Sequence, residues 1–343
     1  MLYRCFIKPI LFFLNPEFAH NFTFSIIKVF FWIPGFKFIL KFYYCVNNKD
    51  LEKKIFGLTF KNPVGLAAGF DKNAKLFDEL SYFGFGFIEI GTVTPLPQVG
   101  NSKPRLFRLP KDEALINRMG FNNDGIDLVV ARLKKRYTNI IIGGNIGKNK
   151  ITSNELAALD YKKCFDKIAP YVDYIVLNIS SPNTPNLRRL QNKSELHSLL
   201  TQVQKLNKQK YNKPILIKIS PDLSIAQIDE ILGLIRKFDI SGIIATNTSS
   251  NRQGLQTSSQ VVEKKGVGGL SGKPLYLKSK KIVNYIHTQT QGDLPIIAVG
   301  GIMSADDAVA MLNAGASLVQ IYSGFVYNGP SIVSEINTKI LRH

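Results

Sequence analysis

Five uncharged polar side chains follow directly on a short apolar run near the middle of the chain. Residues 174–177 are Tyr-Ile-Val-Leu, and runs of this kind form strands that are buried on both faces. The polar residues that follow are Asn178, Ser180, Ser181, Asn183 and Thr184. Pro182 and Pro185 continue neither a central strand nor a helix, so the chain turns out into a loop there. These amides and hydroxyls could bind a planar polar ligand and place one hydroxyl against it, although ordinary turns have the same composition.

The elements that must position this loop predict a barrel. From residue 61 onward, short apolar runs alternate with stretches of helical periodicity, and eight of the runs have the length of strands. They lie at 63–69, 87–92, 140–146, 174–179, 214–219, 242–246, 295–300 and 318–322. Eight β-then-α units in series predict an α/β fold, a (β/α)8 TIM barrel, in which the loops after the strands share one rim and form the active site.

Signals for helix starts and stops lie between these strands. Thr152 with Glu155, and Ser224 with Gln227, have the spacing of capping boxes. Gly315 is placed to end the helix that precedes the last strand.

The predicted strand ends carry small or hydrogen-bonding residues around the whole rim. Gly300-Gly301 and Ser323-Gly324 follow the last two strands, where barrels often bind phosphate through backbone N–H groups. They predict a phosphate-bearing cofactor. The connections 93–125 and 249–273 are much longer than a barrel needs, and long connections are commonly functional or disordered.

Two lysines lie at strand ends. Lys218 emerges from the interior of the barrel. An unpaired ammonium is costly there, so Lys218 needs an anionic partner. A reduced flavin ring and a buried carboxylate are the two candidates, and the flavin is favoured because few acids lie near strand ends. Lys72 either pairs with Asp71 or holds a substrate carboxylate.

The rim offers few other catalytic groups. No Asp, Glu or His dominates it, so the expected base is a hydroxyl, and Ser181 is the best placed. The histidines and cysteines make no metal-binding pattern, so no metal is expected. The three cysteines also lie far apart, which favours a reducing compartment.

Charge and the first 44 residues bear on partners. The net charge of +19 could favour binding to nucleic acid, to an anionic membrane or to an anionic ligand, but an excess of basic residues spread over solvated faces is favoured.

Residues 1–44 hold 11 of the 23 Phe and the only Trp. Two helices are expected there, one over 1–14 and one between Pro16 and Pro34. Charges interrupt every apolar run, so neither helix spans a membrane. A membrane surface and packing on the protein's own core are equally open.

Taken together, the motifs resemble the class 2, quinone-dependent dihydroorotate dehydrogenase family over essentially the whole chain. The matching segments are 67–72 (Ala-Ala-Gly-Phe-Asp-Lys), 117–121 (Asn-Arg-Met-Gly-Phe), 178–184 (Asn-Ile-Ser-Ser-Pro-Asn-Thr), Lys218, 246–248 (Thr-Asn-Thr), 268–272 (Gly-Gly-Leu-Ser-Gly), 299–302 (Val-Gly-Gly-Ile) and 322–323 (Tyr-Ser). Each motif alone is weak, but their order and spacing are specific.

The resemblance implies that FMN binds on the rim and that dihydroorotate is oxidised to orotate in pyrimidine synthesis. Ser181 is then the base that removes the C5 proton while hydride leaves C6 for flavin N5, and Thr184 and Phe121 assist the proton's exit. The implied substrate residues are Lys72, Asn117, Arg118, Met119, Gly120, Phe121, Asn178, Asn183, Asn247 and Thr248. The implied cofactor residues are Ala68, Gly69, Phe70, Asp71, Lys72, Thr92, Asn145, Asn178, Lys218, Thr246, Gly272, Gly301, Tyr322 and Ser323.

Class 2 rests on two features: a serine rather than a cysteine at position 181, and the aromatic N-terminal segment. The resemblance therefore favours a membrane-associating segment over 1–44 that admits a quinone, followed by an FMN-binding barrel over 45–343. His20 and Arg108 match positions near the quinone path. The lack of a transit peptide and of a spanning helix predicts a peripheral protein on the cytoplasmic face of a bacterial inner membrane. A monomer is expected, with no nucleic-acid partner.

Three rival functions are less favoured. A soluble class 1 enzyme would have a cysteine at position 181 and no apolar N-terminus. An FMN barrel that reduces uridines in tRNA would suit the positive charge, but a catalytic cysteine is expected for that chemistry. A membrane-bound barrel without catalysis would leave the matched rim unexplained.

Overall fold

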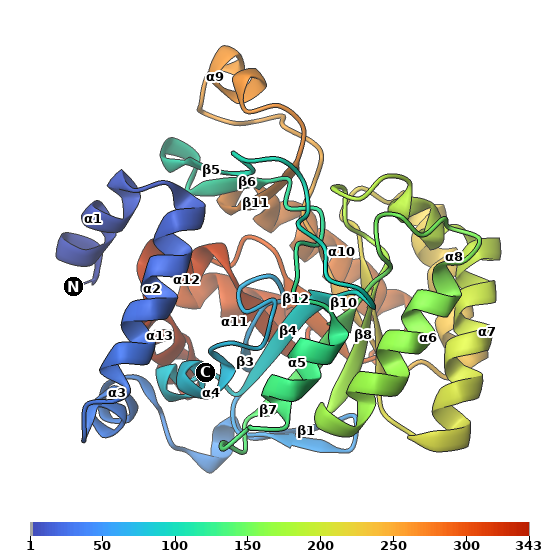
Figure 1. Cartoon of the computed structure of the whole chain (residues 1–343), viewed down its shortest axis with the longest axis horizontal. Coiled ribbons are helices and arrows are strands. Elements are labelled where there is room, and N and C mark those ends of the chain that lie inside the picture. The colour runs from blue at the N-terminus through green and yellow to red at the C-terminus, as the bar shows by residue number, and fades with distance from the viewer. Residues whose placement is uncertain (1–2, 343) are drawn as a thin grey trace.

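A closed ring of eight parallel strands forms the centre of the protein (Figure 1) in a computed structural model that describes residues 3–342. The order around the ring is β10-β12-β13-β3-β4-β7-β8-β9. In chain order the strands are β3 (Val64–Leu66), β4 (Phe87–Val93), β7 (Ile141–Ile146), β8 (Tyr174–Asn178), β9 (Ile215–Ile219), β10 (Gly242–Ala245), β12 (Ile296–Val299) and β13 (Leu318–Ile321). All eight predicted strands are present, and the (β/α)8 barrel is confirmed.

Helices surround the ring and bury one face each against it (Figure 1). They are α4 (Phe77–Leu80), α5 (Ile126–Leu133), α6 (Ala157–Ile168), α7 (Lys193–Lys210), α8 (Ile225–Phe238), α10 (Tyr276–Gln289), α11 (Ala305–Asn313), α12 (Ser323–Asn328) and α13 (Ser331–Ile340).

One of the two predicted capping boxes is present. Ser224 and Gln227 cap α8 reciprocally as expected. The box predicted at Thr152 is wrong, because α6 begins only at Ala157 and has no side-chain cap. The preceding loop is tied to the helix differently: the backbone N–H of Asn149 donates to the Asp160 carboxylate at 2.8 Å.

The barrel lumen is filled in two layers of different character. Its lower part is apolar, with Phe87, Tyr174, Leu216 and Leu318 among the residues that fill it. Side chains two positions apart on a strand point the same way, so the next inward residues on three of these strands are Glu89, Lys218 and Gln320. The upper layer, next to the rim, is therefore polar. Below the lumen, the hairpin of β1 (Lys53–Ile55) and β2 (Leu58–Phe60) closes the barrel.

The two long connections pair with each other above the rim. They form an antiparallel sheet of β5 (Leu106–Leu109), β6 (Ala114–Asn117) and β11 (Gly269–Gly272), in the order β11-β6-β5. We call it the cover sheet. The short helix α9 (Ser259–Lys264) projects beyond it (Figure 1). Both connections are thus ordered parts of the rim.

The N-terminal segment contains three α-helices where two were expected: α1 (Lys8–Phe13), α2 (Pro16–Phe30) and α3 (Phe36–Tyr44). The predicted number of helices was wrong because a third helix, α3, begins directly after Pro34. Gly35, with φ of +86°, is its N-cap. A π-helical turn at Tyr3–Ile7 precedes α1, and positions 1–2 of the predicted first helix lie outside the described residues. Within residues 3–342, no helix is both long and apolar enough to cross a membrane.

An ion pair anchors α2 to the barrel. Arg105 donates to both oxygens of Glu17, from Nη2 at 2.6 Å and from Nε at 3.1 Å, and only 5% of the Arg105 side chain is exposed. Burial alone would raise the pKa of Glu17, but the hydrogen bonds and charge of Arg105 outweigh it and hold the pKa below its usual value.

Glu17→Gln should therefore destabilise the docking of α2 by about 2 kcal/mol, since it removes the carboxylate charge from both hydrogen bonds with Arg105. It leaves the hydrogen bonds from Arg105 to the carbonyl groups of Val99 and Asn101 in place. A carboxyl whose pKa is lowered by folding stabilises above its unfolded pKa, so this contribution should be lost as the pH falls below about 4. Urea unfolding of both proteins at pH 7 and at pH 3.5 measures the difference. An equal loss of stability at both pH values would contradict the assignment to Glu17.

Candidate active site

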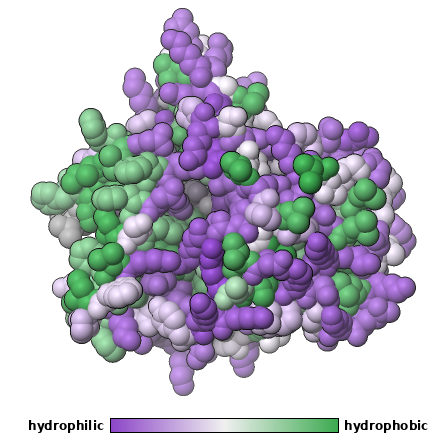
Figure 2. All heavy atoms as spheres, in the orientation of Figure 1, coloured by the Kyte–Doolittle hydropathy of each residue, from purple (hydrophilic) through white to green (hydrophobic). Residues whose placement is uncertain are grey.

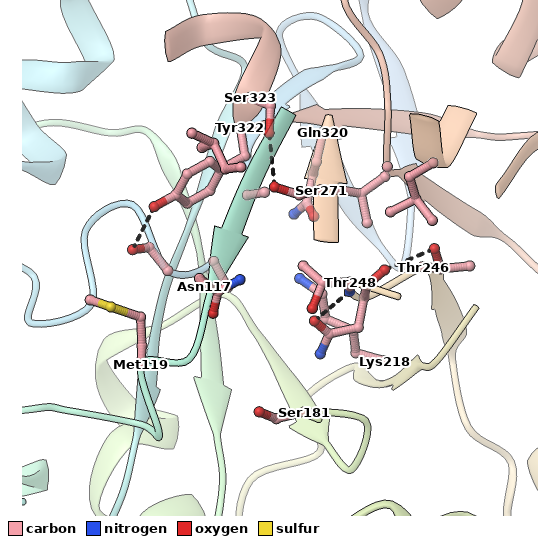
Figure 3. A pocket seen from close by; sticks show the side chains of 18 of the residues that line it. Asn117, Met119, Ser181, Lys218, Thr246, Thr248, Ser271, Gln320, Tyr322 and Ser323 are labelled. Atoms are coloured by element: carbon pink, nitrogen blue, oxygen red, sulfur yellow. Dashed lines mark hydrogen bonds between the residues drawn. The ribbon is translucent and has the colours of Figure 1, made fainter. Parts of the chain in front are cut away.

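A cavity of about 1130 Å³, counted to its open mouth, lies between the barrel rim and the cover sheet. Its lining includes these predicted residues: Ala68, Gly69, Lys72, Thr92, Asn117, Met119, Gly120, Phe121, Asn178, Ser181, Asn183, Lys218, Thr246, Asn247, Thr248, Gly272, Gly301, Tyr322 and Ser323. The structure thus brings the polar strand ends together in one place (Figure 3).

Ser181 lies at the end of β8 with its side chain buried against the cavity. Its Oγ accepts the backbone N–H of Asn183 at 3.2 Å, which fixes the hydroxyl at the start of the loop that contains the two prolines. Among residues 3–342, the Ser181 hydroxyl donates to no other group. The buried Oγ1 of Thr184, on the same loop, also has no partner within the described part of the chain. Two hydroxyls are therefore free to exchange a proton with a ligand or water.

A network of amides surrounds this hydroxyl. Asn247 Nδ2 donates to Ser180 Oγ at 3.0 Å and to Asn178 Oδ1 at 3.3 Å. Asn183 Nδ2 donates to Asn117 Oδ1 at 2.9 Å, which joins the serine loop to the cover sheet. Amide groups held in this way present donors and acceptors to the edges of a planar heterocycle.

Lys72 supplies a cation to the same cavity. Its Nζ donates to Asn122 Oδ1 at 2.5 Å, and burial, with the charge of Arg105, lowers its pKa to about 7. It forms no ion pair with Asp71, whose buried carboxylate accepts the backbone N–H groups of Lys75 and Leu76 instead. Lys72 is therefore placed to bind an anionic group of a ligand.

Glycines form the opposite end of the cavity. Gly272, Gly300 and Gly301 all have positive φ, at 97°, 123° and 80°. A Cβ on Gly272 would lie 2.3 Å from the backbone oxygen of Glu113, and a Cβ on Gly301 would lie 2.3 Å from the backbone nitrogen of Tyr276, so no other residue fits there. Beside them, the hydroxyls of Ser271 and Ser323 are 3.0 Å apart (Figure 3). Exposed backbone N–H groups and hydroxyls of this kind fit a phosphate group.

Lys218 has a partner that sequence analysis missed. Its Nζ lies 3.3 Å from Glu89 Oε1, deep in the barrel. The sequence-based preference against a buried carboxylate was therefore wrong: the acid comes from the interior of β4, four residues before the strand ends at Val93. The signal was available, since a charged residue in the apolar run 87–90 has to find a partner.

Four predicted cofactor or substrate residues lie outside the cavity lining. Asn145 sits just beneath it and accepts from Thr92 Oγ1 at 2.5 Å. Arg118 turns away and donates to the carbonyl groups of Lys265 and Pro104. Phe70 packs against the ring of Tyr322. The Asp71 carboxylate stabilises the loop that follows it by accepting backbone N–H groups. Phe70, Asp71 and Asn145 support residues that do line the cavity.

The two residues predicted for the quinone path lie where α1 and α2 meet the barrel. His20 packs on Phe24 and Phe70, with ring centroids 4.3 and 5.2 Å away, and burial lowers its pKa to about 4. Arg108 donates to the carbonyl groups of Leu11, Phe12 and Leu14 at the end of α1. Both residues therefore lie between the apolar N-terminal helices and the cavity.

Comparison with known proteins decides the family. The family model for dihydroorotate dehydrogenase matches residues 50–343. The chain belongs to the dihydroorotate dehydrogenase family. A dihydroorotate dehydrogenase (quinone) of Christiangramia forsetii is 53% identical over 99% of both chains. The enzyme of the same name from Coxiella burnetii is 47% identical over 98% of this chain and 96% of its own.

Solved structures agree. The dihydroorotate dehydrogenase of Eimeria tenella, crystallised in complex with ferulenol, has a TM-score of 0.86 and 36% identity, and the match covers 96% of this chain and 91% of that one. The bacterial relatives named above are quinone-dependent enzymes, so the prediction of class 2 is confirmed.

Proposed function

We propose that this protein oxidises dihydroorotate to orotate and passes the electrons through bound FMN to a membrane quinone, as a step in pyrimidine synthesis. One observation carries the proposal: a buried serine hydroxyl, a lysine hydrogen-bonded to a neutral amide and a set of amides line the same cavity as a glycine-rich phosphate cradle. Full-length similarity to quinone-dependent relatives supports the same activity.

The residues divide the cavity between two ligands. Lys72 would bind the substrate carboxylate, while Asn117, Asn178, Asn183 and Asn247 would bind the ring edges. Ser181 would then remove the C5 proton, with the Thr184 hydroxyl receiving it on the way out. FMN, when bound, supplies the acceptor for the hydride from C6. A serine hydroxyl is a weak base at its free pKa, so its fixed geometry and burial have to activate it.

The glycine end of the cavity would hold the FMN phosphate. Thr92, Lys218 and Tyr322, which line the same cavity, would hold the ring of the cofactor. The positive φ of the three glycines, whose backbone can approach a ligand closely, supports this fit.

The decisive experiment is an anaerobic absorbance measurement on detergent-purified protein. We expect a flavin spectrum that dihydroorotate bleaches and a short-chain quinone restores, while fumarate and NAD do not. A flavin that dihydroorotate leaves oxidised would contradict the proposal.

The pKa of Lys72 predicts a pH dependence of orotate binding. Below pH 7 the ammonium is charged and attracts the carboxylate, and above pH 7 the neutral amine must first take up a proton. Orotate affinity should therefore fall as pH rises through about 7, approaching tenfold per pH unit. Flavin difference spectra during orotate titration from pH 6 to 9 measure it.

Lys72→Met should bind orotate weakly with a flat pH profile, whereas Lys75→Met, which removes a lysine outside the cavity, should keep the wild-type profile. A Lys72→Met protein that retained the slope would show that another group titrates.

The N-terminal helices support docking on a bilayer surface. One face packs on the barrel, with Ala19 and Leu40 buried, and the other face exposes large apolar side chains. These are Phe6, Ile7, Ile10, Phe13, Phe18, Phe22, Ile26, Val29, Phe30, Trp32, Ile33, Phe38, Ile39, Phe42 and Tyr43, and we call them the apolar face. Figure 2 shows apolar residues gathered on this side of the molecule. The protein would bind peripherally at the cytoplasmic face of the membrane, and quinone would enter past His20 and Arg108.

A further inference from the structure

A single buried carboxylate joins four strands beneath the cavity floor. Glu89 Oε1 accepts from Asn145 Nδ2 at 2.7 Å and from Lys218 Nζ at 3.3 Å. Its Oε2 accepts from Gln320 Nε2 at 2.6 Å. The donors come from β7, β9 and β13, and the carboxylate itself comes from β4. Glu89, Asn145 and Gln320 are fully buried, and Lys218 is 4% exposed.

The carboxylate lies one layer below the ligands. Lys218 and Gln320 line the cavity, but Glu89 does not, so its charge acts from behind the ammonium. Beneath it, the lumen is filled by apolar side chains and by the ring of Tyr174. Because this apolar packing has a low dielectric constant, it screens the two charges only weakly, and they have a strong effect on the electrostatic potential at the cavity floor.

The ion pair makes the floor nearly neutral overall. An isolated ammonium at this depth would strongly favour any negative charge that develops above it. Reduction of a flavin ring adds such negative charge, so an uncompensated Lys218 would hold electrons on the ring and hinder their transfer to an acceptor. A carboxylate 3.3 Å from the ammonium opposes that effect. It also fixes the ammonium in one position, because its other lone pairs are taken by two amides.

We propose that Glu89 is a positioning residue that orients the Lys218 ammonium under the flavin and lowers the reduction potential of the bound cofactor, so that electrons leave readily for the quinone. This inference rests on the proposed function, since it requires FMN over Lys218. Glu89 itself touches neither cofactor nor substrate.

The test compares holoproteins by the midpoint potential of the flavin, measured by spectroelectrochemical titration with mediator dyes. Glu89→Gln removes one negative charge without changing the size of the side chain, so the midpoint should shift to a more positive potential. Glu89→Asp keeps the charge but withdraws it from Lys218, so its midpoint should lie between those of Glu89→Gln and the wild type. The control is Asp166→Asn, which breaks an exposed pair with Lys210 outside the barrel and should leave the midpoint unchanged.

A second readout is FMN affinity, measured by fluorescence quenching when flavin is added to apoprotein. Glu89→Gln should bind FMN about tenfold more weakly, because Lys218 loses the partner that holds it in place. A purely structural role would lower the thermal stability of the protein but leave the midpoint of the bound flavin where it was.

An unchanged midpoint in Glu89→Gln that binds FMN stoichiometrically would overturn the inference. If that variant does not fold, Glu89→Asp carries the test, and an unchanged midpoint there has the same meaning. A wild-type protein that binds no FMN would instead defeat the proposed function, so the two failures are distinguishable.

Discussion

Replacing Ser181 by alanine should slow flavin reduction by dihydroorotate by about 10²–10⁴-fold, the usual contribution of a positioned general base. The side chain removed is the one whose hydroxyl is fixed by the Asn183 N–H and donates to no described group. FMN and orotate should still bind, because the amides, Lys72 and the glycine cradle are intact. Stopped-flow reduction at saturating dihydroorotate isolates the chemical step from quinone turnover.

Ser180→Ala is the matched control, since this neighbouring hydroxyl accepts from Asn247 on the other side of the strand end. It should weaken orotate binding more than it slows reduction. Thr184→Val should give a smaller slowing than Ser181→Ala if its unpartnered hydroxyl carries the proton onward. A Ser181→Ala protein that reduced its flavin at the wild-type rate would remove Ser181 from the role of base.

Converting three residues of the apolar face to serine should abolish the use of long-chain quinone. Phe13, Trp32 and Phe42 are 93%, 88% and 82% exposed, so their replacement removes apolar area without disturbing the core. Burial of one such side chain stabilises by about 1.5–3 kcal/mol, so the triple variant should bind lipid vesicles at least about a hundredfold more weakly. Vesicle co-sedimentation measures binding directly.

Flavin reduction by dihydroorotate should survive in the triple variant, as should reoxidation by a water-soluble short-chain quinone. The control triple Ile151→Ser, Val267→Ser and Leu277→Ser alters exposed apolar residues elsewhere and should bind vesicles normally. Vesicle binding lost equally in both triples would show that general surface apolarity, and not the N-terminal helices, drives association.

The sequence predicts the barrel well because each strand is a short apolar run that the fold buries on both faces. The residues of the rim are equally predictable, since topology alone brings the ends of parallel strands together. Ser181 and Lys218 follow from that logic without any knowledge of side-chain contacts. The order of strands around the ring also follows from eight consecutive β-then-α units.

The sequence did not reveal which residues from distant segments interact with each other. Glu89 appeared as one more residue in a strand, and only the closed barrel shows that Lys218 meets it across the lumen. The Glu17–Arg105 pair joins residues 88 positions apart, and no local pattern marks it. The start of α3 was missed because Pro34 was taken as the end of the helical segment, whereas Gly35 restarts the backbone.

The ring of strands closes between its first and last members. Val319 pairs with Val64 and Ile321 with Leu66, so the hydrogen bonds that seal the barrel join β3, which is synthesised first of the eight strands, to β13, which is synthesised last. Until β13 is available, β3 and β12 each present an open edge, which is a template for wrong pairing. A ribosome-bound chain therefore contains a nearly complete but unsealed sheet, together with the exposed apolar side chains of α1, α2 and α3. We expect the solubility of the chain, as much as its catalysis, to depend on the segment from β13 onward.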